Sequence, residues 1–231
     1  MYQASYAMRK HLTKDIQAYH SSKERDFSYF LKGYTDDAVQ SGEPLILRRD
    51  PRTGEETAHS PEPELALVLG KQHEIVGYTL ANDLTAFLIE TGERTAEFDG
   101  TYYGKLWKGS VALGPRIIQA QEVSVADLKI GLRIQRNEIT VCDLTYSTKW
   151  RKREFSDLPA MIVARYEEFG PDLPPSKAIS VQNGYLPHGT VVLCGTGIVV
   201  SKQYYLQTGD VVTVYSAPFG ELVNKVVQGD V

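Results

Sequence analysis

The chain has 231 residues, 42% of them hydrophobic, a length that can bury one large core or two small ones. Its 25 Lys and Arg against 29 Asp and Glu give a net charge of −4, which does not indicate a nucleic-acid or membrane partner. No apolar run approaches the roughly 20 residues of a membrane span, and the N-terminus lacks the apolar core of a signal peptide. We therefore expect a cytoplasmic protein in which Cys142 and Cys194 are buried free thiols, with one disulfide as the alternative.

The first half of the chain predicts a helix followed by short strands. Residues 5–23 are charged and compatible with a helix, and SGEPLILRRD indicates a turn into a strand. Residues 50–64 are rich in Pro, Gly and charge, which is typical of a loop. Three strand-like runs follow, LALVLG, HEIVGYTLAND and GSVALGPRII. Between the last two, the segment starting DLTAFLIETG has helical spacing from Leu84, with Gly92 as a stop.

The second half predicts a hairpin, one helix and further strands. Residues 128–134 alternate apolar and polar, QRNE forms a turn, and ITVCDL returns as the second strand. SDLPAMIVARYEEFG predicts a helix with Ser156 as its N-cap and Gly170 as its stop. The tail holds three more strand-like runs, GTVVLCGTGIVV, LQTGDVVTVYSA and GELVNKVV. Many short strands with few helices predict a mainly β roll or sandwich with peripheral helices.

Two glutamates stand one residue apart in the stretch PEPELALVLG. Because side chains alternate along a strand, Glu62 and Glu64 point to the same side, and the apolar run behind them enters a core. Two anions this close repel each other unless a cation or a hydrogen-bond network lies between them. Considered alone, the stretch favours a solvated strand end at which the prolines block edge pairing.

A third carboxylate, Asp83, ends the next predicted strand in GYTLANDLTA. Its local interpretation is an N-cap of the helix that follows. Neighbouring strands lie only about 4.8 Å apart, however, so Asp83 can converge with Glu62 and Glu64. Oxygen-only ligation of this kind suits Mg²⁺, Mn²⁺ or Ca²⁺, with open positions for water and substrate. The spacing is a candidate metal site and is weakly specific by itself.

Other candidate residues each have a structural alternative. Lys105 lies among aromatics and glycines in TYYGKLWKGS, where the alternative is a surface lysine, as we expect for Lys108. The glycines around Thr196 in CGTGIVV either let a ligand approach the backbone or form a bulge. The five histidines show no ligand spacing, and His59 is predicted to lie on the surface. The basic run KWRKR, residues 149–153, indicates a solvated loop or a subunit contact rather than a nucleic-acid patch.

Five segments occur in an order that resembles a known family: PEPELALVLG, GYTLANDLTA, GKLWKGSVALGPRI, GTGIVV and LQTGDVVTVYSAPFGELVNKV. They resemble the C-terminal catalytic domain of the fumarylacetoacetate hydrolase superfamily, over residues 30–227 of this chain. GTGIV in place of the more usual GTP-x-G, and the opening YQASYAMR, resemble the branch of 2-keto-3-deoxy sugar-acid dehydratases. The resemblance implies a mixed β-roll or β-sandwich and a homodimer or homotetramer.

The family's metal site can be carried over by position. Its divalent-metal carboxylates correspond to Glu62, Glu64 and Asp83. Its active-site lysine lies ten residues before the proline of the LGP motif, which is Pro115 here, and therefore corresponds to Lys105.

The family's substrate contacts can be carried over in the same way. The substrate-contacting threonine of the Gly-Thr motif corresponds to Thr196, preceded by Gly195, and the two are expected to bind the substrate carboxylate end. The segment FLKG resembles the family's Phe-x-Lys segment, which places Lys32 at the edge of the pocket.

Two departures from the family pattern concern the start of the chain. Hydrolases and decarboxylases of the superfamily often carry a His-x-x-Glu pair after an Asn-Tyr, and those places hold Ser5 and Met8 here. Neither residue can act as a general base, which disfavours a water-activating hydrolase. Family members also usually have a segment before this point. We expect residues 1–29 to be an N-terminal helical segment, a lid or a truncated region, and residues 30–231 to be the catalytic domain.

The resemblance implies a metal-dependent carbon–oxygen lyase that removes water from a 2-keto-3-deoxy sugar acid, such as 2-dehydro-3-deoxy-arabinonate. The cation would chelate the 2-keto acid and stabilise the enolate formed when C3 loses a proton. Lys105 would hold the substrate, or shuttle a proton if its pKa is lowered in the site. The alternatives are an acylpyruvate-type hydrolase, an oxaloacetate-type decarboxylase, an inactive metal-binding relative, and a nucleic-acid-binding module that uses the basic run.

Overall fold

A computed structural model describes most of the chain: residues 29–91, 100–151, 153–169 and 179–229. Several sequence predictions lie outside these residues: the helix over 5–23, Ser5, Met8, and the helix stops Gly92 and Gly170. None of the described helices is long and apolar enough to cross a membrane.

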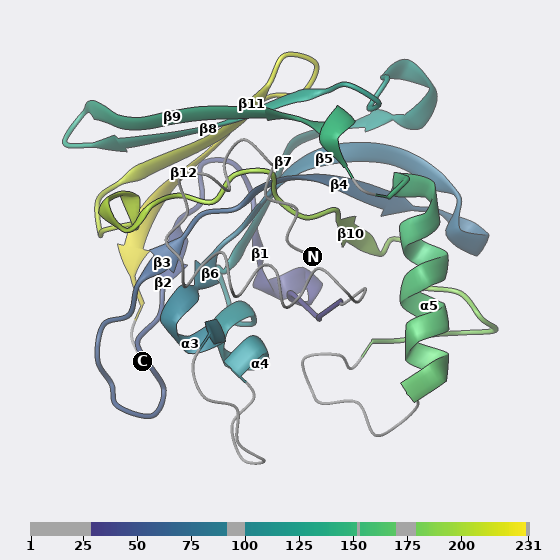
Figure 1. The fold of residues 1–231 in the computed structure, drawn as a ribbon, viewed down its shortest axis with the longest axis horizontal. Coiled ribbons are helices and arrows are strands. Elements are labelled where there is room, and N and C mark those ends of the chain that lie inside the picture. The colour runs from purple at the N-terminus through teal and green to yellow at the C-terminus, as the bar shows by residue number, and fades with distance from the viewer. Residues whose placement is uncertain (1–28, 92–99, 152, 170–178, 230–231) are drawn as a thin grey trace.

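Two five-stranded sheets stack on each other (Figure 1). The first contains, in order, β1 (Ala38–Val39), β7 (Val111–Gln119), β5 (Ile75–Asp83), β4 (Pro63–Leu69) and β10 (Val191–Leu193). The second contains β2 (Leu45–Leu47), β12 (Gly220–Gln228), β11 (Val211–Ser216), β8 (Lys129–Arg136) and β9 (Ile139–Ser147). β1 and β2 pair in parallel at the two edges, whereas the other neighbours are antiparallel. This arrangement confirms the predicted mainly β sandwich of mixed strand direction.

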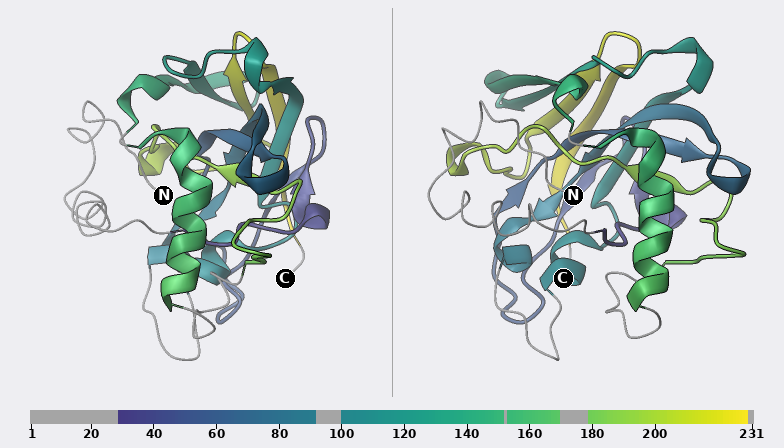
Figure 2. Two further views of the ribbon diagram at one scale, coloured as in Figure 1. Left: turned by 90° about the vertical axis from the view of Figure 1, so that its right-hand side faces the viewer. Right: turned by 45° about the vertical axis from the view of Figure 1, so that its right-hand side comes forward.

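In the part of the chain that the structure describes, a small third sheet and three α-helices flank the sandwich. β3 (His59–Ser60) pairs with β6 (Thr85–Ala86) beside the first sheet. In Figure 1, α3 (Phe87–Thr91) and α4 (Gly100–Lys105) lie below this sheet, and α5 (Leu158–Phe169) stands at one end. Figure 2 shows the same helix from two further sides, and its Leu158 and Val163 belong to the buried core cluster.

Short 3₁₀ helices connect several of these elements. They are η1 (Thr35–Asp37), η2 (Lys71–His73), η3 (Ala120–Glu122), η4 (Thr148–Trp150), η5 (Phe155–Asp157) and η8 (Lys202–Tyr204).

Three local predictions about the helices are wrong. The helix expected from Leu84 begins at Phe87, because Thr85 and Ala86 pair with β3 first, so Asp83 is not its N-cap. Ser156 lies inside η5 rather than capping α5. In addition, α4 was not predicted; its glycines permit close packing, since a Cβ at Gly104 would lie 2.7 Å from the Cβ of Glu90 on α3.

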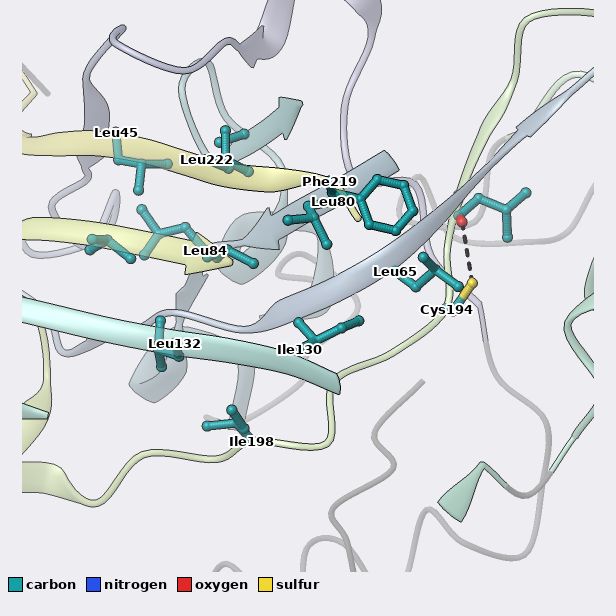
Figure 3. Packing of buried hydrophobic residues seen from close by; sticks show 14 of the residues in the cluster. Leu45, Leu65, Leu80, Leu84, Ile130, Leu132, Cys194, Ile198, Phe219 and Leu222 are labelled. Carbon is teal, nitrogen blue, oxygen red and sulfur yellow. Dashed lines mark hydrogen bonds between the residues drawn. The ribbon is translucent and has the colours of Figure 1, made fainter. Parts of the chain in front are cut away.

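The core between the sheets uses the alternation predicted from the sequence. On β4 the leucines at 65, 67 and 69 are at most 1% exposed, and the predicted hairpin residues from Leu128 to Ile134 bury every second side chain. Leu65 and Leu80 of the first sheet and Ile130 and Leu132 of the second belong to one buried cluster, and Figure 3 shows Leu80 beside Phe219. Cys142 and Cys194 are both buried free thiols, as predicted. The apolar faces of β4 and β8 therefore fix the two sheets against each other.

A buried ion pair joins β8 to the turn that enters β11. Arg136 donates from Nε and Nη2 to the two carboxylate oxygens of Asp210 at 2.9 and 2.8 Å, and the Asp210 side chain is 1% exposed. The same carboxylate accepts the backbone N–H of Gln207 at 2.9 Å. Asp210, which follows Gly209 in the segment LQTGDVVTVYSA, thus closes the turn and orients the arginine.

We expect Asp210→Ala to lower the free energy of unfolding by about 3 kcal/mol, because it removes a buried carboxylate and leaves a partly buried guanidinium without its bidentate partner. Asp143→Ala is the matched control, since Asp143 pairs with Arg133 on the exposed face of the same sheet and should cost less than about 1 kcal/mol. Urea unfolding at pH 7 measures both. Equal losses in the two variants would contradict the structural role given to Asp210.

Candidate metal centre

The pairing of β4 with β5 brings three carboxylates together. Pro63 lies opposite Asn82 in this antiparallel pair, so Glu62, just before β4, meets Asp83 at the end of β5. The Asp83 N–H donates to the Glu62 carbonyl at 2.9 Å, and the Asn82 side-chain oxygen accepts the Glu62 N–H at 3.0 Å. Each of the three acids offers one oxygen within 4.8 Å of the others. The predicted convergence of Glu62, Glu64 and Asp83 is therefore present.

The three carboxylates are buried, which excludes the solvated strand end. Glu62 is 4% exposed, Glu64 is 2% and Asp83 is 2%. Burial raises the pKa of Glu62 to about 7, with Lys105 opposing and Asp83 adding to the shift, and burial together with the charge of Asp83 raises the pKa of Glu64 to about 8. For Asp83, burial also acts to raise the pKa, but the ammonium groups of Lys105 and Lys32 outweigh it and lower the pKa. The negative charge is held most firmly at Asp83.

Lys105, the last residue of α4, lies inside this cluster and is 0% exposed. Its Nζ lies 3.0 Å from Glu62 Oε2 and 3.1 Å from Asp83 Oδ2, and it also contacts the Thr85 hydroxyl. Burial lowers the pKa of Lys105, but the charges of Asp83 and Glu62 raise it more, to a value well above the ordinary one. The side chain is thus a protonated bridge between two acids, and the surface-lysine alternative is wrong.

Lys32 forms a second cationic contact with Asp83. Its Nζ lies 2.8 Å from Asp83 Oδ1 and donates to the carbonyls of Leu84 and Lys105, each at 2.6 Å. Burial lowers its pKa to about 8, although Asp83 acts to raise it. Its position 4.9 Å from the ring centre of Trp107 adds a cation–π contact. Lys32 lies within the carboxylate cluster, and only 8% of it is exposed.

Two further side chains belong to the cluster and escaped the sequence analysis. The Thr85 hydroxyl donates to Glu62 Oε1 at 2.9 Å. Glu90 on α3 is 1% exposed, and its charge raises the pKa values of both Glu62 and Lys105. Thr85 follows Asp83 by two residues and therefore could have been found from strand alternation. Glu90 could not, because its approach depends on the packing of α3 against α4.

The charges and donor atoms of the cluster fit a divalent cation. Among the described residues, four buried carboxylates face two buried ammonium groups, an excess of two negative charges when all are ionised. Glu64 contributes to this excess directly, since it accepts the backbone N–H of Gly195 and no described lysine forms an ion pair with it. Carboxylate oxygens without nitrogen or sulfur suit Mg²⁺, Mn²⁺ or Ca²⁺. Glu62, Glu64 and Asp83 are thus able to hold such an ion.

The segment after β10 forms one wall of the site. The Gly195 N–H donates to Glu64 Oε2 at 2.6 Å, and Gly195 has a φ of 87°, which favours glycine. A Cβ at Gly197 would collide with the ring of Tyr146. Thr196 is fully buried, and its hydroxyl bonds the Ile198 N–H at 3.0 Å and the Ile198 carbonyl at 3.1 Å. The glycines therefore serve close approaches, and the threonine hydroxyl closes the loop.

His59 is buried, so its prediction as a surface residue is wrong. It is 1% exposed in β3, with Nδ1 2.9 Å from the Thr57 carbonyl and Nε2 accepting the Arg48 N–H at 3.1 Å. The second bond requires an unprotonated Nε2, so Nδ1–H donates to Thr57. Burial lowers the pKa of His59 to about 4. Both ring nitrogens are occupied by backbone groups, which gives His59 a structural role.

Residues 2–227 match the family model described as fumarylacetoacetate (FAA) hydrolase C-terminal. The chain is 26% identical over 201 residues to 2-dehydro-3-deoxy-D-arabinonate dehydratase from Saccharolobus solfataricus, covering 85% of this chain and 57% of the relative. It is 26% identical over 198 residues to a probable 2-keto-3-deoxyxylonate dehydratase from Haloferax volcanii, covering 85% of this chain and 59% of the relative.

Solved structures give the same picture of the fold. One, described as 2-keto-3-deoxy-D-arabinonate dehydratase complexed with magnesium and 2,5-dioxopentanoate, matches with a TM-score of 0.67 and 25% identity. The match covers 87% of this chain and 62% of that one. A fumarylacetoacetate hydrolase from Exiguobacterium antarcticum shares the fold with a TM-score of 0.59 at 24% identity, over 84% of this chain and 64% of that one. The chain thus spans about three fifths of the length of these relatives.

The buried His59 should make stability depend on pH. Its pKa is about 4 in the folded state against 6.5 when unfolded, so between these values only the unfolded chain takes up the proton. This contribution is complete above pH 6.5 and is lost as the pH falls, by about 3 kcal/mol at pH 4. Urea unfolding of wild type and His59→Gln from pH 4 to 7.5 measures it. We expect a weaker pH dependence in His59→Gln but not in His188→Gln, a control at an exposed histidine; parallel profiles would contradict the assignment.

Glu64→Gln tests the metal centre without disturbing the Lys105 contacts. We expect wild type to gain thermal stability with Mg²⁺, because an ion that binds only the folded state stabilises it. Glu64→Gln should lose this gain while melting at the same or a higher temperature without metal, since one buried charge is removed. Differential scanning calorimetry with and without roughly 5–10 mM Mg²⁺ measures the melting temperature and its gain with the metal. Glu221→Gln, at an exposed residue, is the control. If Glu64→Gln keeps the full Mg²⁺-dependent rise in melting temperature, Glu64 is not a metal ligand.

Proposed function

This chain belongs to the fumarylacetoacetate hydrolase family, and we propose that it is a divalent-metal-dependent dehydratase of a 2-keto-3-deoxy sugar acid. The observation that carries the proposal is the buried, oxygen-only cluster of Glu62, Glu64 and Asp83, bridged by Lys105. The two relatives with dehydratase names, each matched over 85% of this chain, support the choice of reaction. The segment GTGIV, Gly195–Val199, supports the same branch of the family.

In this proposal Glu62, Glu64 and Asp83 hold the cation, which is Mg²⁺, or else Mn²⁺ or Ca²⁺. When bound, the ion supplies Lewis-acid stabilisation of the negative charge that develops on the 2-keto oxygen as C3 is deprotonated. The protein's part is to keep the carboxylates in place. Thr85 fixes one oxygen of Glu62, Gly195 fixes one of Glu64, and the two lysines fix Asp83.

Lys105 acts in this scheme as a permanent positive charge. Its pKa is raised by Asp83 and Glu62 against the effect of burial, so the ammonium does not give up its proton within the cluster. A fixed cation beside the reacting carboxylate and keto groups favours the anionic state in a water-poor site. We therefore propose that Lys105 binds and stabilises the anionic substrate, with Lys32 holding Asp83 from the other side.

Gly195 and Thr196 are proposed to shape the substrate side of the centre. The Gly195 N–H is already committed to Glu64, and the Thr196 hydroxyl to Ile198. Direct contact of Thr196 with the substrate carboxylate therefore requires the hydroxyl to exchange its Ile198 carbonyl for the ligand. We propose that this exchange accompanies substrate binding.

We also propose that the enzyme is cytoplasmic and works as a homodimer or homotetramer, with residues 30–231 as its catalytic domain. Two buried free thiols fit a reducing compartment. Family resemblance supports the oligomer and the domain boundary.

The reaction is tested by incubating the protein with 2-dehydro-3-deoxy-arabinonate and Mg²⁺ and following 2,5-dioxopentanoate, the product of losing one water, by NMR. We expect turnover that EDTA abolishes and Mg²⁺ restores. Lys105→Gln should lower kcat/KM at least 100-fold, about the cost of removing a charge that stabilises the transition state, whereas Lys108→Gln, at an exposed lysine on the same segment, should be unaffected. Pyruvate release from an acylpyruvate or from oxaloacetate, without dehydration of the sugar acid, would overturn the proposal.

A further inference from the structure

A hollow adjoins the metal centre and opens to solvent. On one side it is lined by Leu65 of β4 and by Gly195 and Gly197, in the segment that follows β10. On the other side it is lined by Tyr146 of β9 and by side chains from the segment after it, among them Arg151. The hollow thus lies where the edges of the two sheets meet.

Two contacts link this hollow to the carboxylates. Gly195 lines it and donates its N–H to Glu64 Oε2 at 2.6 Å. The Tyr146 hydroxyl donates at 3.3 Å to the carbonyl of Pro63, the residue between the two glutamates. Burial and then the charge of Glu64 raise the pKa values of Tyr146 and Cys194, which both line the hollow, so the Glu64 carboxylate is close to its wall.

Most polar groups in the hollow already have partners within the protein. The Thr148 hydroxyl donates to the Val125 carbonyl and accepts the Leu128 N–H, both at 2.7 Å. The Ser147 hydroxyl donates to Asp127. Arg151 differs, because its Nε is buried and has no hydrogen-bond partner among the described residues. An Nε–H in this position is a donor available to a ligand.

The rest of the Arg151 guanidinium is held in place and neutralised. Nη1 donates to the Ala126 carbonyl at 3.0 Å, and Nη2 lies 2.5 Å from Glu154 Oε2. The guanidinium also packs 5.3 Å from the ring centre of Phe155. Because Glu154 offsets the charge, the Nε–H suits a neutral acceptor such as a hydroxyl oxygen better than a second carboxylate. Leu65 and Phe155 supply apolar contact for a carbon chain.

We propose that this hollow is the specificity subsite for the hydroxylated tail of the 2-keto acid, with the Arg151 Nε–H donating to a tail hydroxyl. The inference rests on the proposed function, because it places the carboxylate and keto group of the same molecule at the metal centre. It divides the basic run 149–153: Arg151 turns into the hollow, whereas the Lys149 side chain is 49% exposed and pairs loosely with Asp127 at 3.8 Å. A monocarboxylate with hydroxyls beyond C3 is the expected substrate class.

Arg151→Gln is the direct test, with Lys149→Gln as the matched control. We expect Arg151→Gln to raise the KM for 2-dehydro-3-deoxy-arabinonate about tenfold, the usual cost of losing one charge-assisted hydrogen bond. Inhibition by pyruvate, which has no tail, should change less than about twofold. Lys149→Gln should change neither constant. An unchanged KM in Arg151→Gln, or equal weakening of sugar acid and pyruvate, would overturn the subsite.

Glu154→Gln provides a reciprocal test that keeps Arg151 in place. Removing the offsetting charge should strengthen binding of 2-oxoglutarate, a 2-keto acid with an anionic tail, about tenfold relative to pyruvate. Calorimetric titration in Mg²⁺ measures both ligands. If wild type already binds 2-oxoglutarate more tightly than the sugar acid, the hollow takes an anionic tail and the proposal is wrong.

The subsite and the reaction can fail separately. If wild type does not dehydrate the sugar acid, that acid is a stable ligand, and its calorimetric affinity in wild type and Arg151→Gln gives the same comparison without turnover. An affinity for the sugar acid that is about tenfold weaker in Arg151→Gln would then support the subsite, although the dehydratase assignment would be wrong. If wild type dehydrates the sugar acid and Arg151→Gln has the same KM, the reaction is supported and the subsite is contradicted.

Discussion

The structure depends on the antiparallel register of β4 and β5. With Pro63 opposite Asn82, three acids from two strands are forced to within 4.8 Å of one another in a buried position. A shift of one residue would turn both glutamates into the sheet interface and the leucines out of it. The apolar packing of Leu65, Leu67 and Leu69 against the second sheet therefore fixes the register, and through it the charge cluster. Core and site are two faces of one strand.

Such a cluster is unfavourable unless cations and hydrogen bonds compensate it. Lys105 reaches it from the end of α4, and Lys32 from the segment before η1, so compensation comes from parts of the chain far from the strands. The position of α4 in turn depends on glycine at 104, where a side chain would collide with Glu90. The packing of α3 against α4 thus positions the ammonium group of Lys105.

How much of this could be foreseen differs from element to element. Period-two alternation gave the hairpin of β8 and β9, and the order of strands and acids gave Glu62, Glu64 and Asp83, because these depend on local geometry. The identification of Lys105 rested on family resemblance, because no periodicity predicts α4. The prediction of His59 as a surface residue is wrong because the composition of its loop does not reveal its two backbone partners. These are the Arg48 N–H, just after β2, and the Thr57 carbonyl in the same loop as His59. The place of Glu90 in the cluster could not be predicted, because it depends on the packing of α3 against α4.

The compensation within the cluster is incomplete, and this has a chemical consequence. Lys105 and Lys32 both act on Asp83, whereas Glu64 receives only a backbone N–H in the described contacts. Burial acts to raise the pKa of all three acids, and only at Asp83 do two ammonium groups outweigh it, so the pKa of Asp83 falls while those of Glu62 and Glu64 rise. The negative charge of Glu64 is therefore the least compensated by the lysines, and a cation bound beside Glu64 would be attracted most strongly. Since Gly195 joins Glu64 to the hollow, the side of the centre that best attracts a cation is also the side from which the Arg151 subsite is reached.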